Sequence, residues 1–213
     1  MILQIPTQPE ELTFLDLLLK GGFIMYPIFV LLMVVIYVSI ERFLYLKDST
    51  KKESNLIDLV KNSLKTGDVN GAKLRAAHLS SATGRIILNG LGSLGRPIRE
   101  IESVLESSTN IEIAQMEKNM AYLGIIAGIA PMLGFIGTIS GIIHIFYDIS
   151  LSDNISIGII AGGLYEKMIT SGSGLVVGVL AYAAYHMLHV SIQRFALQIQ
   201  KDAFEFIQSL QQK

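Results

Sequence analysis

Five polar side chains that could hold or pass a proton lie inside two otherwise apolar stretches of this chain. They are Thr138, Glu166, Thr170, Ser171 and Ser173. A hydroxyl can donate or accept a hydrogen bond without bearing charge. An ionisable group at membrane depth is costly, so it usually faces a water-filled cavity or the protein interior. The pattern therefore indicates a polar path through an apolar protein, in which Glu166 is the single carboxylate of the two stretches.

The same residues also have a purely structural interpretation. Ser and Thr can bond to backbone carbonyls of their own helix, and Glu166 would then be an interfacial carboxylate at the outer end of its helix. Lys167 is not an obvious partner for Glu166, because neighbours on a helix point about 100° apart. His144, His186 and His189 do not converge in the sequence. They are interpreted as interfacial or packed side chains, and no metal site is predicted.

Composition assigns the chain to the membrane class. Apolar residues make up 51% of it, charged residues 16%, and the mean hydropathy is +0.50, whereas soluble domains carry roughly 25% charge. A net charge of −1 gives no reason to expect nucleic acid as a partner. The absence of Cys excludes disulfides and thiolate chemistry. No nucleophile–base pair is evident, so neither an enzyme nor a cofactor is expected.

Three segments meet the requirement of about 20 apolar residues for a membrane-spanning helix. They are residues 23–46, 119–147 and 156–190. We therefore predict an all-α membrane protein with three transmembrane helices, and a tail at 191–213 that keeps helical periodicity.

The segment 47–118 is predicted to form helices separated by turns. Breaks are expected at Thr66-Gly67-Asp68, at Asn70-Gly71 and at Gly95-Arg96-Pro97. From Ile98 the apolar periodicity continues without a breaker into the second span, which predicts one very long helix.

Lys and Arg side chains predict the orientation. They are concentrated in residues 47–118 and recur in 191–213, whereas the loop 148–155 has none. Because positive residues mark the cytoplasmic side, the loop and residues 1–22 are expected outside. Residues 12–20 have one apolar face and are predicted to form a short interfacial helix, with a mobile tail as the alternative. No basic stretch precedes the first apolar run, so a cleaved signal peptide is not expected.

Small residues recur at a spacing of four in the second and third spans. The pairs are Gly124/Gly128, Gly137/Gly141, Gly158/Gly162 and Gly174/Gly178. Helices in lipid approach closely over small residues, so these spans are expected to form a densely packed bundle or oligomer. The predicted helix-packing positions are Pro131, Gly134, Gly137, Gly141, Gly174 and Gly178.

The polar residues belong to longer motifs. Residues 131–141 read Pro-Met-Leu-Gly-Phe-Ile-Gly-Thr-Ile-Ser-Gly, and residues 166–175 read Glu-Lys-Met-Ile-Thr-Ser-Gly-Ser-Gly-Leu. These stretches, with residues 21–27 and 40–43, resemble the second-span, third-span and first-span motifs of the MotA/TolQ/ExbB proton-channel family. The resemblance runs in order along nearly the whole chain, and the three spans favour the ExbB/TolQ branch.

The resemblance implies a function and partners. Thr138 and Ser171 would line a channel, with Glu166 near its outer part and Thr170 and Ser173 as further lining candidates. The channel subunit would form a pentamer in the bacterial inner membrane around the single-span helices of an ExbD/TolR-type partner. An aspartate of that partner would carry the proton, and proton passage would drive work at the cell envelope: nutrient uptake, envelope maintenance or surface motility.

Departures from the motif, and a competing function, remain open. Ser171 stands in place of Thr, Lys167 in place of a small residue, Leu180 in place of Pro and His186 in place of Asn. The alternative function is a structural membrane scaffold whose polar residues only pack helices. A small-solute transporter would show inverted repeats or broken helices, which this sequence lacks.

Overall fold

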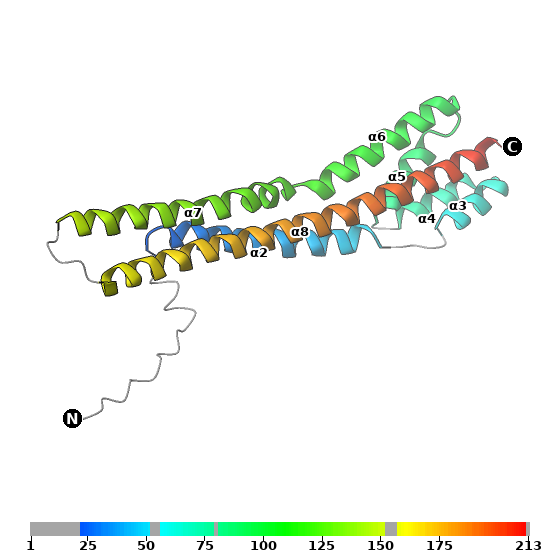
Figure 1. Ribbon diagram of the computed structural model, residues 1–213. Coiled ribbons are helices and arrows are strands. Elements are labelled where there is room, and N and C mark those ends of the chain that lie inside the picture. Colours follow the sequence, from blue (N-terminus) through cyan, green and yellow to red (C-terminus); the bar gives the residue numbers. More distant parts are fainter. Residues whose placement is uncertain (1–21, 52–55, 79–80, 152–156, 212–213) are drawn as a thin grey trace, which may run out of the picture. The chain divides into compact units, whose positions relative to one another are not determined.

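The computed structural model describes residues 22–51, 56–78, 81–151 and 157–211, and these residues form helices without any strand (Figure 1). The all-α prediction is therefore confirmed. The helices are α2 Met25–Ser49, α3 Leu56–Lys65, α4 Val69–Ala77, α5 Ala82–Gly92, α6 Ile98–Glu117, α7 Met120–Leu151 and α8 Ile157–Gln211. The predicted interfacial helix at 12–20 and residues 152–156 of the predicted loop lie outside the described residues.

Three of these helices are long and apolar enough to cross a membrane, as predicted. They are α2, α7 and the part of α8 from Ile160 to Gln211. The protein is therefore a multi-pass membrane protein. With 55 residues, α8 is about 80 Å long, far more than the ~30 Å hydrocarbon core needs. The predicted third span and the predicted C-terminal tail are thus one continuous helix.

The chain divides into two compact units, each built from several helices. Unit 1 contains Met1–Ile36 and Gly124–Tyr182, and unit 2 contains Tyr37–Leu123 and Ala183–Lys213. In unit 1, the described residues are the first half of α2 with most of α7 and the first half of α8. Unit 2 adds α3, α4, α5 and α6 to the remaining parts of α2 and α8 and to the first turn of α7.

The core of unit 2 is apolar and draws on most of its helices. Its fully buried side chains include Val60, Ile86, Ile87, Leu91, Leu105, Met116, Leu123, Ile192, Ile199 and Phe206. Side-chain caps begin two of its short helices. The Asp68 carboxylate accepts a 2.8 Å hydrogen bond from the Gly71 amide, and the Ser81 hydroxyl accepts one of 3.2 Å from the Gly84 amide.

The predicted breaks in this region have different outcomes. Those at 66–68 and 95–97 are confirmed, because they lie between α3 and α4 and between α5 and α6. The break predicted at Asn70-Gly71 is wrong, because both residues lie in the first turn of α4. The Asp68 cap stabilises the start of α4, and this local hydrogen bond outweighs the weak helix propensity of Asn and Gly.

The single long helix predicted from Ile98 into the second span is also wrong. α6 ends at Glu117, and α7 begins at Met120. Lys118 has extended backbone angles, with φ −51° and ψ 134°, and Asn119 has φ 65°. Asn is among the few residue types that tolerate this left-handed conformation. The chain therefore breaks its helix without a Gly or Pro, which is why apolar periodicity did not reveal it.

Candidate functional site

The candidate path residues lie along the contact between α7 and α8 in unit 1. The backbones touch there because glycines face them. A Cβ atom added to Gly134 would lie 3.0 Å from the Ser171 carbonyl oxygen. A Cβ on Gly174 would lie 2.5 Å from the Ala130 carbonyl oxygen. Distances this short leave no room for a side chain, so the two helices approach as closely as their backbones allow.

Other predicted packing positions receive a side chain from the facing helix. A Cβ on Gly137 would lie 2.8 Å from a methyl carbon of Thr170, and one on Gly178 would lie 2.5 Å from the Pro131 ring. A Cβ on Gly141 would overlap the aliphatic stem of Lys167. By contrast, Cβ atoms on Gly128 and Gly162 would meet no described atom within 4 Å. All six predicted packing positions thus take part in the contact, whereas Gly128 and Gly162 lie outside it.

Thr138 forms a polar link between the two helices. Its hydroxyl donates to the Lys167 carbonyl oxygen of α8 at 3.2 Å and to the Gly134 carbonyl oxygen of its own helix at 3.3 Å. Its side chain is half-buried. Since a hydroxyl has one hydrogen, the two carbonyls share it, and the lone pairs of the oxygen remain available as acceptors.

The other candidates lie on the same part of α8. Thr170 is fully buried beside Gly137, whereas Ser171 and Ser173 are half-buried. Glu166 lies in α8, but its side chain is outside the described part of the structure. Lys167, next to it, has its stem on Gly141 and its amine 3.5 Å from the position of a Cβ on Gly22. Lys167, which stands in place of a small residue, is thus accommodated by Gly141 on α7.

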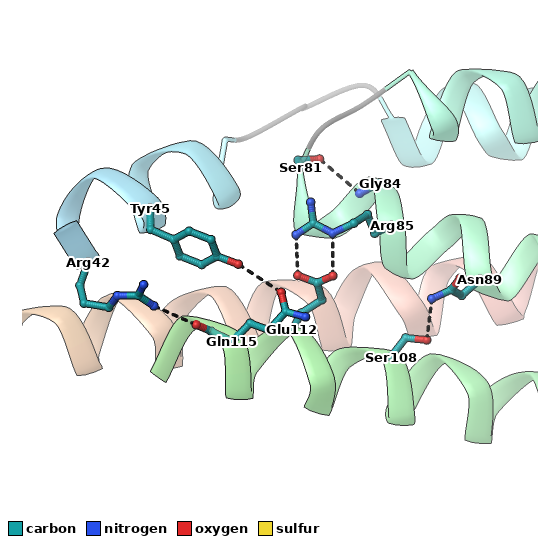
Figure 2. Close-up of polar contacts among 9 residues, drawn as sticks. All are labelled: Arg42, Tyr45, Ser81, Gly84, Arg85, Asn89, Ser108, Glu112 and Gln115. Atoms are coloured by element: carbon teal, nitrogen blue, oxygen red, sulfur yellow. Dashed lines mark hydrogen bonds and ion pairs between the residues drawn. The ribbon is translucent and has the colours of Figure 1, made fainter. Parts of the chain in front are cut away.

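Unit 2 contains several separate polar contacts that sequence reasoning missed (Figure 2). Arg85 of α5 donates two hydrogen bonds of 2.6 Å, from Nε and Nη2, to the two carboxylate oxygens of Glu112 of α6. Glu112 is buried, and this hydrogen bonding raises the pKa of the Arg85 guanidinium. Four residues earlier on α6, Ser108 accepts a 3.1 Å hydrogen bond from the Asn89 amide. α5 and α6 are therefore joined by polar groups as well as by apolar packing.

Arg42 of α2 binds the end of α6. It is buried, pairs with the neighbouring Glu41, and donates from Nη1 to the Gln115 carbonyl oxygen at 3.0 Å. The Tyr45 hydroxyl donates to the Gln115 side-chain oxygen at 3.3 Å. A cation at this position also complements the negative end of the α6 dipole. The Glu41-Arg42 motif was visible in the sequence as part of the family resemblance, but nothing in the sequence indicated its partner 73 residues away.

Comparison with known proteins agrees with this architecture. The sequence profile of the MotA/TolQ/ExbB proton channel family matches residues 78–201. An ExbB-like biopolymer transport protein of Synechocystis sp. is 29% identical over 185 residues, which cover 84% of this chain and 71% of the relative. An ExbB homologue of Methanothermobacter thermautotrophicus is 28% identical over 174 residues, which cover 81% of this chain and 62% of the relative. The Tol-Pal system protein TolQ of Haemophilus influenzae is 30% identical over 98 residues, which cover 46% of this chain and 41% of the relative.

The family profile covers α5, α6, α7 and most of α8, and so includes Thr138, Ser171 and the contacts around them. The resemblance recognised from the motifs is confirmed. The chain therefore belongs to the MotA/TolQ/ExbB proton channel family, in its ExbB/TolQ branch.

Proposed function

We propose that this chain is the proton-channel subunit of an inner-membrane motor that couples the proton motive force to work at the cell envelope. Five copies surround the transmembrane helix of an ExbD/TolR-type partner, and an aspartate of that helix carries the proton. Thr138 carries the proposal, because its hydroxyl lies at the α7–α8 contact with free acceptor capacity. Ser171 and Ser173, half-buried on α8, and Thr170 complete the lining.

The charge distribution supports a carrier from another chain. Residues 119–147 contain no carboxylate, and residues 156–190 contain only Glu166. A relay across a bilayer needs a titratable group, so either Glu166 or a partner's carboxylate must serve. A proton that crosses 100 mV releases about 2.3 kcal/mol. Several protons per cycle would supply enough energy for a large conformational change.

The geometry of Thr138 favours one protonation state of the carrier. Its hydrogen is directed to backbone carbonyls, so towards a third group the oxygen acts as an acceptor. A protonated carboxyl can donate to it, whereas a carboxylate cannot. Thr138 would therefore stabilise the neutral carrier midway through the membrane, where charge is most costly.

Lys and Arg asymmetry supports a periplasmic N-terminus and a cytoplasmic C-terminus.

The test is proton flux into vesicles that contain the complex of this chain with its partner. We expect flux with the wild-type pair and none when the partner's membrane aspartate is changed to Asn, with the complex intact. Flux that persists in that variant contradicts the aspartate-carrier mechanism.

A structural scaffold is the second candidate. It is favoured by the same hydrogen bonds of Thr138, because a hydroxyl that links two helices also stabilises their packing. An intact wild-type complex without flux would support this function.

A further inference from the structure

The part of α8 in unit 2 has a second apolar stripe that faces away from the core. Val190, Leu197 and Phe204 follow one another at intervals of seven, and their exposed fractions are 42%, 62% and 67%. On the opposite face, Leu188, Ile192, Phe195, Ile199 and Phe206 are buried. A spacing of seven places residues on one side of a helix, as in the contact seam of a coiled coil. The helix is therefore apolar on two sides, and the described residues leave one of them exposed.

Lipid is an unsuitable cover for this stripe. Arg194 and Lys201 lie between its apolar members, also seven residues apart, and both are exposed. A face that alternates Leu and Phe with cations cannot enter hydrocarbon cheaply. It suits a helix–helix seam in water, where charges border an apolar contact. We call Val190, Arg194, Leu197, Lys201 and Phe204 the α8 seam.

The outer side of α6, also in unit 2, has the complementary character. Ser103, Ser107, Asn110 and Ala114 are exposed and short, at a 4-3-4 spacing. Glu102 and Glu106 border them and are exposed as well. Short side chains leave a shallow track for Leu and Phe, and the carboxylates complement the two cations of the α8 seam. We call these six residues the α6 track.

Two contacts within unit 2 give the relative heights of the two surfaces. His189 of α8 lies 3.8 Å from Glu117 of α6. Further along, Leu105 of α6 and Phe206 of α8 both approach Gly90, at 2.7 Å and 3.3 Å from the position of its Cβ. α6 and α8 therefore run in opposite directions. Counted along both helices from the His189–Glu117 contact, at 1.5 Å per residue, Leu197 is level with Asn110, Lys201 with Glu106 and Phe204 with Ser103, each to within one residue.

Rotational symmetry allows the two surfaces to meet between adjacent copies. Rotation about an axis parallel to the helices keeps the height of every residue, so the α8 seam of one copy can meet the α6 track of the next in register. The alternative, seam against seam, would bring Arg194 and Lys201 of one copy against the same cations of another. Like charges at such a contact are repelled. A contact between two different surfaces closes into a ring when the rotation fits.

We propose that the α8 seam docks on the α6 track of an adjacent copy, with Leu197 over Asn110, Phe204 over Ser103 and Lys201 paired with Glu106. This inference rests on the homo-oligomer of the proposed function and not on proton conduction. It assigns the assembly a contact outside unit 1.

Cysteine cross-linking of the full complex in membranes tests the contact, and the chain has no Cys to interfere. A chain with both Leu197→Cys and Asn110→Cys should form a ladder of cross-linked multimers. Leu197→Cys chains mixed with Asn110→Cys chains should stop at dimers. Leu197→Cys with Leu74→Cys is the control, because Leu74 is 63% exposed on α4, and it should give no ladder.

Charge reversal tests the pairing. Lys201→Glu should lower the cross-linking yield by about fivefold, the effect of ~1 kcal/mol, and adding Glu106→Lys should restore it. Arg75→Glu, on the exposed part of α4, should leave the yield unchanged.

Three results would overturn the inference: dimers from Leu197→Cys alone, cross-links of Leu197→Cys to the single-span partner, or no ladder from a correctly assembled complex. Proton flux measured on the same vesicles separates the two proposals. A ladder without flux counts against the channel and supports the contact between copies. Flux without a ladder supports the channel and counts against the contact.

Discussion

The guanidinium of Arg42 donates a 3.0 Å hydrogen bond to the backbone carbonyl oxygen of Gln115, three residues before the break between α6 and α7. The same carbonyl accepts a 3.4 Å hydrogen bond from the Lys118 amide. The end of α6 is therefore held both by its own chain and by α2. Without the Arg42 guanidinium, this carbonyl would keep only the longer hydrogen bond from Lys118.

Replacing Arg42 should loosen this helix end. We expect Arg42→Gln to lower the free energy of unfolding of unit 2 by about 1–3 kcal/mol, because a buried charged hydrogen bond is lost and Glu41 is left without its partner. Amide hydrogen exchange should accelerate in the last turn of α6. Arg42→Lys keeps the charge but reaches Gln115 with a different geometry. Its free energy of unfolding should lie between those of the wild type and Arg42→Gln. Exchange unchanged in Arg42→Gln would contradict the capping role.

Asn119 should accept Gly and reject a β-branched residue. Its φ of 65° costs roughly 1–2 kcal/mol for an ordinary side chain. Asn119→Gly should therefore be neutral or slightly stabilising, whereas Asn119→Val should destabilise by that amount or join α6 to α7 as one helix. Thermal unfolding and the distance between spin labels on Ser107 and Tyr122 distinguish these outcomes. Equal stability of the two variants would show that the left-handed conformation is not required.

The Arg85–Glu112 pair should couple α5 to α6 energetically. A double-mutant cycle with Arg85→Met and Glu112→Gln should give a coupling energy of about 1 kcal/mol, since Arg85 is partly exposed and water screens the pair. Arg85→Met alone should cost more than Glu112→Gln alone, because it leaves the buried Glu112 carboxylate unpaired, whereas water can solvate the partly exposed Arg85. Asn89→Ala, which removes only the contact with Ser108, is the neutral-bond control. A coupling energy near zero would reduce the pair to a surface contact.

Gly174 should be intolerant of even one methyl group. A Cβ there would lie 2.5 Å from the Ala130 carbonyl oxygen, so Gly174→Ala must push α7 and α8 apart. We expect a loss of about 1–3 kcal/mol and less folded protein in detergent. Gly128→Ala is the matched control, because its Cβ would meet no described atom within 4 Å. If both variants behave alike, the close approach of the helices is not what stabilises unit 1.

Thr138 distinguishes a channel-lining hydroxyl from a structural one. Thr138→Val is nearly isosteric and removes only the hydroxyl. We expect it to abolish or strongly reduce proton flux, while native mass spectrometry of the same preparation shows the oligomer unchanged. Thr138→Ser keeps the hydroxyl and should retain most of the flux. Disassembly of the Thr138→Val complex would assign the hydroxyl to helix packing and exclude the lining role.

Ser171 provides an independent test of the same path. Ser171→Ala should reduce flux in the same direction as Thr138→Val. Ser171→Thr should be tolerated, because it keeps the hydroxyl and restores the residue usual in the family motif. A fully active Ser171→Ala variant would remove this residue from the proposed lining.

The sequence by itself determined the class of this protein, because hydrophobic length is a local property. Twenty apolar residues need no partner to be recognised as a span, so α2, α7 and the apolar part of α8 were predictable. The motif around Thr138 also lies within one continuous stretch, which is why the family could be recognised before any fold was known.

Only the tertiary structure decided which of these residues meet. Gly134 faces Ser171 while Gly128 faces no described atom, although both glycines belong to the same apolar helix, because the contact depends on how α7 and α8 cross. The break at Asn119 was hidden since apolar periodicity continues through it, and backbone angles are not encoded by hydrophobicity. The pairing of Arg42 with Gln115 joins residues 73 positions apart, and the packing of unit 2 brings them together.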